Sequence, residues 1–428
     1  MRNFVSYRRD ALRTRAIPAF DHGSGPNALP HPQGLIIFLA LVATIYNGIL
    51  AFFAARGVPV NSTLIGLVEI GILMCSGVII IKDRFEYGVL PAFSLLYFMI
   101  LIGVTISLIN ETIFFNGIRN FLIVTIFTLL GAHCKFSTLT KIFRIAALVV
   151  LFGLLFEIID IGWFTKFFQP ASYLSATRGM AESKYSNGLS AGTIAYQGRF
   201  SLGLYSGPRT SSIFLEQVSI NCFTIVLELF LLVFIKSLKR FDIALYITVI
   251  ILILATNNAR MGMLVGLIYI AGYFIFPRLP RYTTIIFMPF VIILTFILLS
   301  YTGTSSGDDL IGRLSTTYDL LVSMKASELA LGNLYMLGQA ADSGYAYLIY
   351  STTLFGLIGY WLYLSFILPQ SNEMSKRCAW GLVIYVGIWL LVGGTGSFSM
   401  KTAPLLWLIV GYVRQQSFDD KSPSPQLR

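Results

Sequence analysis

The chain has 428 residues, of which 56% are hydrophobic and only 12% are charged, and its mean hydropathy is +0.76. A soluble domain carries about twice that charged fraction, so the composition excludes a soluble globular protein and predicts a membrane protein. The formal net charge of +11 would suit a nucleic-acid-binding protein only if a soluble basic domain carried it, and the sequence has no such domain.

Runs of about 20 mostly apolar residues, the length that crosses the hydrocarbon core, follow one another along the chain. They lie near 34–54, 62–81, 89–109, 117–133, 142–163, 215–235, 241–256, 261–276, 282–300, 343–368, 379–394 and 398–413. The runs are continuously apolar rather than alternating, which excludes a β-barrel. The sequence therefore predicts an all-α, polytopic transmembrane helical bundle of about 12 spans, over residues 34–413.

The distribution of Lys and Arg predicts the orientation of these spans. If the N-terminus is cytoplasmic, 20 of the 31 basic residues fall in cytoplasmic segments, and every cytoplasmic loop is short and basic, as in KSLKR at 236–240. The positive-inside rule then places both termini in the cytoplasm. Residues 1–33 are expected to form a disordered, basic cytoplasmic tail, and residues 414–428 a second cytoplasmic tail.

Two long loops, 164–214 and 301–342, are predicted on the outer side of the membrane. Loops of this length in a compact protein are usually functional or disordered, and their aromatic residues argue against complete disorder. None of the three histidines falls on the outer side, so acid–base chemistry there would depend on Asp, Glu, Tyr or Lys. The sequence also lacks nucleotide-phosphate motifs and metal-ligand spacings, so we expect no cofactor and no metal.

Three arginines on the outer side run against the insertion bias, namely Arg119, Arg209 and Arg260. Each lies at or near the predicted N-terminus of a helix, where the dipole and unpaired N–H groups favour an anion and a guanidinium adds a bidentate donor. The three helix ends could converge on a phosphate or pyrophosphate. Contact with lipid headgroups and structural ion pairs are the alternative roles for each arginine.

Four glutamate and aspartate residues are informative. Glu216 follows Arg209 by seven residues, two helical turns, with helix-dipole complementarity or an arginine pair as its alternative role. Asp342 precedes the tenth predicted span and could be an N-cap. Glu69 and Glu228 lie inside predicted spans, so each must face the bundle interior or a polar cavity, as a proton relay or in a buried hydrogen bond.

Three stretches of the chain resemble the Wzy-type polysaccharide polymerase and O-antigen ligase superfamily. GPRTSSIFLEQ is similar to the family's R-x-x-S-x-F-x-E-P stretch, with Gln217 where proline is usual. ATNNARMGMLVGLI is similar to its S-R helix start, with Asn258-Ala259-Arg260 in place of Ser-Arg. LGNLYMLGQAADSGYAYLIYSTTLFGLIGYWLYL is similar to the last large loop running into a Gly-rich helix. Ligases typically carry a histidine before that helix, and its absence from AADSGYAYL favours the polymerase branch.

This resemblance implies an enzyme of the bacterial inner membrane whose active face is periplasmic. The donor would be an oligosaccharide on undecaprenyl pyrophosphate, and the reaction would transfer the growing chain onto a sugar hydroxyl of another lipid-linked repeat unit. The candidate partners besides the bilayer are a chain-length regulator and an export complex. The alternatives are an O-antigen-type ligase, a non-enzymatic carrier or flippase, and a scaffolding subunit of an export complex.

The resemblance also implies roles for particular residues. Arg209 and Arg260 would contact the pyrophosphate, with Arg119 and Arg313 as further candidates. The general base would be Glu216 or Asp342, because a carboxylate can accept the proton of the acceptor hydroxyl. Arg199 and Tyr345 are the candidates for contact with the glycan, and an interfacial aromatic belt is the alternative for Tyr345.

Overall fold

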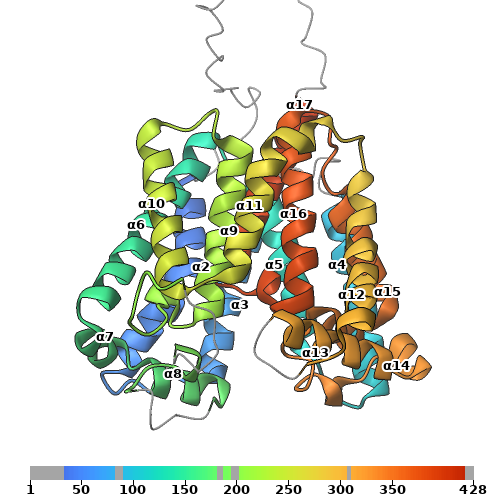
Figure 1. Ribbon diagram of the computed structural model, residues 1–428, viewed down its shortest axis with the longest axis horizontal. Helices are drawn as coiled ribbons and strands as arrows, with labels where there is room; N and C mark the ends of the chain where they lie inside the picture. The colour runs from blue at the N-terminus through green and yellow to red at the C-terminus, as the bar shows by residue number, and fades with distance from the viewer. Residues whose placement is uncertain (1–32, 82–89, 181–186, 194–201, 306–309, 420–428) are drawn as a thin grey trace, which may run out of the picture. The chain divides into compact units, whose positions relative to one another are not determined.

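The structure is a computed structural model that describes residues 33–81, 90–180, 187–193, 202–305 and 310–419 (Figure 1). These residues form helices and connecting turns and contain no strand. Eleven of the helices are long and apolar enough to cross a membrane. The chain is thus a multi-pass membrane protein, and the predicted polytopic helical bundle is confirmed.

The eleven helices follow the predicted spans closely, and two of them, α11 and α12, reach spanning length together with an adjoining 3₁₀ turn. They are α2 (Gln33–Ala54), α3 (Ser62–Ile81), α4 (Leu90–Ile109), α5 (Phe115–Ala132), α6 (Phe136–Ile159), α9 (Gln217–Phe234), α10 (Arg240–Asn257), α11 (Arg260–Ile275), α12 (Phe287–Thr302), α15 (Gly344–Phe366) and α16 (Glu373–Val392). Two 3₁₀ turns, η4 (Phe276–Arg278) and η5 (Thr283–Ile286), join α11 to α12. A twelfth helix, α17 (Ala403–Asp419), has 17 residues and corresponds to the last predicted span.

The predicted start of the last span is wrong. Residues 396–398 form a 3₁₀ turn, η7, so α17 begins at Ala403 rather than at 398. The helix then continues to Asp419, so residues 414–419 are helical, and the cytoplasmic tail expected from residue 414 stays a prediction. Residues 1–32 and 420–428 lie outside the described residues, and the cytoplasmic location of both termini stays a prediction.

The described parts of the two long loops contain short helices, which lie at the same end of the bundle (Figure 1). The first contains α7 (Ile161–Phe168) and α8 (Pro170–Arg178), and the second contains α13 (Leu310–Ser323) and α14 (Ala326–Leu331). Asp160 caps α7 by accepting the N–H of Trp163 at 2.9 Å. Gln169, with φ +43°, then turns the chain into α8, whose first residue is a proline.

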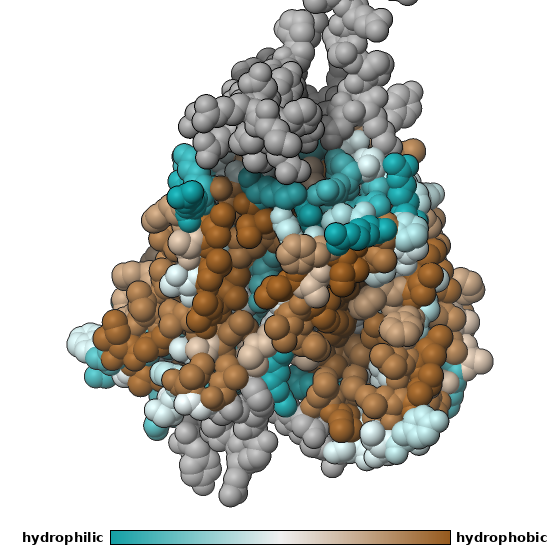
Figure 2. Space-filling model, turned by 45° about the horizontal axis from the view of Figure 1, so that its top comes forward, coloured by the Kyte–Doolittle hydropathy of each residue, from teal (hydrophilic) through white to brown (hydrophobic). Residues whose placement is uncertain are grey.

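The bundle has an interior and a lipid-facing layer. Nearly all of α9 and α17 is buried, and α17 packs on α5 through two glycines. A Cβ at Gly131 would meet the Leu408 carbonyl oxygen, and one at Gly411 would meet that of Thr128, so only glycine allows this close approach. The outer helices instead expose apolar side chains, as Leu267 and Phe290 do. Figure 2 shows such hydrophobic side chains covering the flanks of the helices below a hydrophilic rim, as expected for a protein surrounded by lipid.

Candidate functional site

Glu157 of α6, a residue without a predicted role, binds the segment that leads into α9. The Glu157 carboxylate accepts the backbone N–H of Ser211 at 2.8 Å and of Ser212 at 2.7 Å. Ser212 and Leu215 both have positive φ, so the chain turns sharply between Arg209 and α9. The predicted helical register between Arg209 and Glu216 is therefore wrong, because a 3₁₀ turn, η3 (Ser212–Phe214), separates them.

Arg209 is fixed against the end of α10. Its Nε donates to the Asn257 carbonyl oxygen at 2.6 Å, and Nη2 donates to the Asn257 side-chain oxygen at 3.2 Å. The Asn257 amide in turn donates to the Thr210 carbonyl oxygen at 2.5 Å. Asn258 follows with φ +52° and ends α10, which allows α11 to begin at Arg260. A sharp turn and these three hydrogen bonds thus set the position of the Arg209 side chain.

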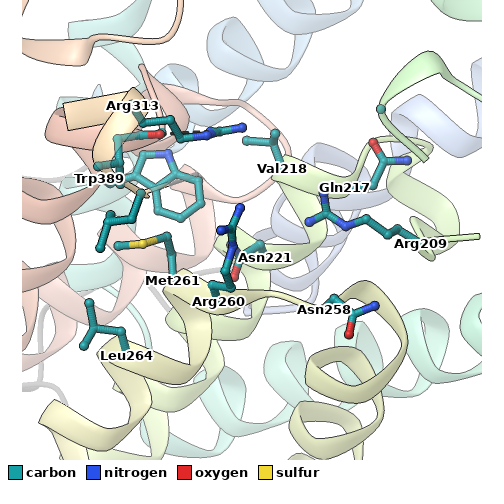
Figure 3. Close-up of a pocket in the computed structure, with 14 residues that line it drawn as sticks. Arg209, Gln217, Val218, Asn221, Asn258, Arg260, Met261, Leu264, Arg313 and Trp389 are labelled. Carbon is teal, nitrogen blue, oxygen red and sulfur yellow. Dashed lines mark hydrogen bonds between the residues drawn. The ribbon is translucent and has the colours of Figure 1, made fainter. Parts of the chain in front are cut away.

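Arg209, Arg260 and Arg313 line a single pocket of about 400 Å³. Arg260 is the first residue of α11, and Arg313 comes from α13, where its Nη1 donates to the Val392 carbonyl oxygen at 3.0 Å. Figure 3 shows the three guanidinium groups pointing from different segments toward one central space. Three of the four arginines proposed for pyrophosphate therefore lie together, although they are distant in the sequence.

The rest of the pocket lining is polar on one side and apolar on the other. Gln217 and Asn221 contribute amides from α9, whereas Met261, Leu264, Leu310, Trp389 and Val392 contribute apolar surface. Leu264 and Leu310 are 42% and 43% exposed, so the pocket reaches the surface of the bundle. A pocket with three cations and an apolar side suits a ligand with an anionic head and an apolar tail.

Arg119 is not among the residues that line this pocket. Its Nη1 forms an ion pair with Glu69 Oε2 at 2.8 Å, and Glu69 Oε1 accepts the Tyr46 hydroxyl at 2.6 Å. Arg119 therefore takes part in a structural ion pair, which was its alternative role. The same contacts show that Glu69 lies in a buried hydrogen-bonded pair.

Glu216 is the N-cap residue of α9 and joins three parts of the chain. One carboxylate oxygen pairs with Arg178 Nη1 at 2.6 Å, and the other pairs with Lys401 Nζ at 3.1 Å and accepts the Ser219 hydroxyl at 2.8 Å. We call Arg178, Glu216 and Lys401 the Glu216 clamp. Burial opposes ionisation of Glu216, but the charges of Lys401 and Arg178 outweigh it and hold the pKa of the carboxyl well below its usual range.

These pairs bear on the role expected for Glu216. A carboxylate stabilised by two cations is a weak proton acceptor, so the contacts favour the arginine-pair alternative over general base catalysis. Lys401, which the sequence analysis left without a role, is only 3% exposed at its side chain. Burial lowers the pKa of its ammonium group to about 8, against the opposing pull of Glu216. The sequence feature that could have indicated Lys401 is its position as a single lysine beside an apolar run.

The remaining predicted residues lie away from the pocket lining or outside the described residues. Asp342 is exposed, and the N-cap of α15 is Ser343, whose hydroxyl accepts the Ala346 N–H at 3.3 Å, so the N-cap alternative for Asp342 is wrong. Tyr345 is completely buried and donates to the Gly387 carbonyl oxygen at 3.1 Å, which places it neither at a glycan nor in an interfacial belt. Arg199 lies outside the described residues.

Within the described ranges, no group of three or more His, Cys, Asp or Glu side chains could hold a metal ion. Comparison of the chain with protein-family models, curated proteins and solved structures finds no match. The function is therefore inferred from the chemistry of the pocket.

Proposed function

We propose that the protein is a polymerase that joins undecaprenyl-pyrophosphate-linked oligosaccharide repeat units into exopolysaccharide or O-antigen. The reaction takes place on the outer face of the bacterial inner membrane. The observation that carries this proposal is the convergence of Arg209, Arg260 and Arg313 on one pocket with an apolar side. An enzyme that acts on a lipid-linked pyrophosphate needs both features in the same site.

The cationic side of the pocket suits the leaving group of this reaction. When the glycosidic bond to the pyrophosphate breaks, negative charge grows on the leaving oxygen, and donors fixed in advance stabilise it best. Arg209 and Arg313 are held by backbone carbonyl oxygens, and Arg260 adds its charge to the N-terminal dipole of α11. Bidentate guanidinium groups match phosphate oxygens in geometry as well as in charge.

The apolar side of the pocket suits the lipid. Leu264 and Leu310 are partly exposed beside the lining arginines, so an isoprenoid chain could extend along them into the bilayer while the pyrophosphate contacts the guanidinium groups. Asp342 does not line the pocket, and we retain it as the candidate general base because it is exposed and no ion pair engages it among the described residues. We assign Glu216 to holding the start of α9.

The decisive experiment is to delete the gene, extract the lipid-linked glycans and determine their size together with that of the surface or secreted polysaccharide. Loss of polymer with single lipid-linked repeat units on the outer leaflet is the expected result. Full-length polymer that stays attached to its lipid would instead identify a ligase. Single repeat units trapped on the inner leaflet would identify a flippase, and unchanged glycans would overturn the proposal altogether.

A further inference from the structure

Three glutamates are buried within the membrane-spanning helices that the structure describes, and two of them have clear partners. Glu69 in α3 is paired with Arg119 and accepts the Tyr46 hydroxyl. Glu157 in α6 accepts two backbone N–H groups, those of residues 211–212, and a serine hydroxyl. Each of these carboxylates has donors that compensate for its removal from water.

Glu228 differs from both. It lies about 17 Å along α9 from the start of the helix, at 1.5 Å per residue, and is only 8% exposed. Its Oε2 is buried and has no hydrogen-bond partner in the structure as described. The helix that faces it is α11, where a Cβ built on Gly266 would lie 2.8 Å from Glu228 Oε1. The titratable group of α11 that interacts with Glu228 is Tyr269, whose hydroxyl donates to the Gly381 carbonyl oxygen at 2.7 Å, so α11 offers no charged side chain to the carboxyl at this point.

An unpaired carboxylate is costly in such surroundings, since low-dielectric protein and lipid do not replace the water that solvates the charge. Taking up one proton removes the charge at a much smaller cost in free energy. A metal cation is a poor alternative occupant, because no cluster of His, Cys, Asp or Glu suitable for a metal occurs in the described part of the chain. We propose that Glu228 is an intramembrane proton-binding site whose carboxyl is a neutral carboxylic acid at neutral pH.

The bound proton would act on the helix pair that forms one wall of the pocket. Asn221 lies seven residues before Glu228, on the same face of α9, and lines the pocket. A Cβ on Gly262 would lie 2.7 Å from Asn221 Oδ1, so Gly262 and Gly266 together let α11 approach the two polar side chains. α11 in turn begins with Arg260. A charge on Glu228 would disturb the helix contact that positions this arginine relative to α9, whereas a neutral acid preserves it.

This proposal does not depend on the polymerase proposal, and its test needs no substrate. Infrared difference spectra are recorded at neutral pH on the full-length protein in lipid nanodiscs, comparing wild type with Glu228→Gln. We expect the variant to lose a carboxylic-acid C=O band that shifts in D₂O. The matched control is Glu69→Gln, which should lose carboxylate bands because Glu69 is paired with Arg119. Loss of carboxylate bands in Glu228→Gln, with all acid bands retained, would overturn the proposal.

The thermal stability of the same variant gives a second readout. Glutamine is neutral and close in shape to a glutamic acid, so Glu228→Gln should fold and melt within a few degrees of wild type. A variant that fails to fold, or that melts far lower, would show that the wild-type carboxyl is charged and paired and would also overturn the proposal.

Discussion

Arg209 donates from Nε to the carbonyl oxygen of Asn257 at 2.6 Å and from Nη2 to the side-chain oxygen of the same residue at 3.2 Å. The two bonds hold the guanidinium at the junction of α10 and α11, on the wall of the pocket. A donor that is already in place when charge develops needs no reorganisation during the reaction. The two hydrogen bonds to Asn257 therefore make Arg209 a donor that is fixed before the reaction, which its charge alone would not do.

Replacing Arg209 with Ala should abolish long polymer. Loss of one fixed donor for a developing charge typically slows a reaction by about 10²–10³-fold. Arg209→Lys keeps the charge but cannot make both bonds to Asn257, so we expect it to remain strongly defective. Polymer length is measured on gels of extracted polysaccharide, with the amount of protein in the membrane checked by immunoblot. The control is Arg240→Ala, an exposed arginine at the start of α10, which should leave polymer unchanged.

Asp342→Asn tests the candidate base. The amide cannot accept the proton of the acceptor hydroxyl, so single lipid-linked repeat units should accumulate although the exposed position tolerates the change. Asp342→Glu should retain partial polymer formation because it restores a carboxylate. Polymer of normal length from Asp342→Asn would show that another group accepts the proton.

Lys401→Met should destabilise the Glu216 clamp much more than Arg178→Met. The Lys401 side chain is 3% exposed and that of Arg178 is 38% exposed, so the Glu216–Lys401 pair is the more deeply buried of the two, although Glu216 keeps one cation in either variant. Breaking a buried ion pair costs about 3–5 kcal/mol, whereas an exposed pair contributes roughly 0–1 kcal/mol. Thermal unfolding of the purified protein, followed by tryptophan fluorescence, measures both. Equal losses would contradict the buried position of Lys401, and Lys401→Met combined with Glu216→Gln should recover part of the loss.

The clamp also predicts a dependence of stability on pH. The pKa of Glu216 in the folded protein lies well below that of a glutamate in an unfolded chain, about 4.3. The unfolded chain therefore binds more protons in acid, so the contribution of Glu216 to stability is present above pH about 4.3 and is lost as the pH falls toward the folded-state pKa. The difference in melting temperature between wild type and Glu216→Gln should stay constant from about pH 7 to about pH 5 and narrow as the pH falls below about 4.3. A constant difference would show that Glu216 is not ionised in the clamp.

The sequence predicted the spans well because membrane crossing depends on local composition. Any continuous run of about 20 apolar residues must form a helix in lipid, whatever its neighbours are. The last boundary failed because residues 396–402, GSFSMKT, form a turn inside the bundle, where polar backbone groups find partners without lipid contact. Local apolarity cannot distinguish such a buried turn from the start of a membrane-spanning helix.

The candidate site was predicted only where a charge conflicts with the insertion bias. That conflict singled out Arg209 and Arg260, which do line the same pocket, and also Arg119, which does not. Glu216 was singled out as well, but its partners Arg178 and Lys401 lie 38 and 185 residues away in the sequence. A pair of that separation has no local signature, so the ionic environment of Glu216 could be read only from the packing of α8, α9 and the turn before α17.

Gly266→Ala should destabilise the contact between α9 and α11. A Cβ at this position would lie 2.8 Å from Glu228 Oε1 and 3.1 Å from its carboxyl carbon, and overpacking of this kind costs about 1–3 kcal/mol. Gly77→Ala in α3 is the control, because nothing lies within 4 Å of its added Cβ and alanine favours a helix by about 1 kcal/mol. Unfolding of the purified variants should show a loss for the first and no loss for the second. Glu228→Ala should partly rescue Gly266→Ala by removing the carboxyl, and two equally stable alanine variants would show that α11 does not approach α9 at Glu228.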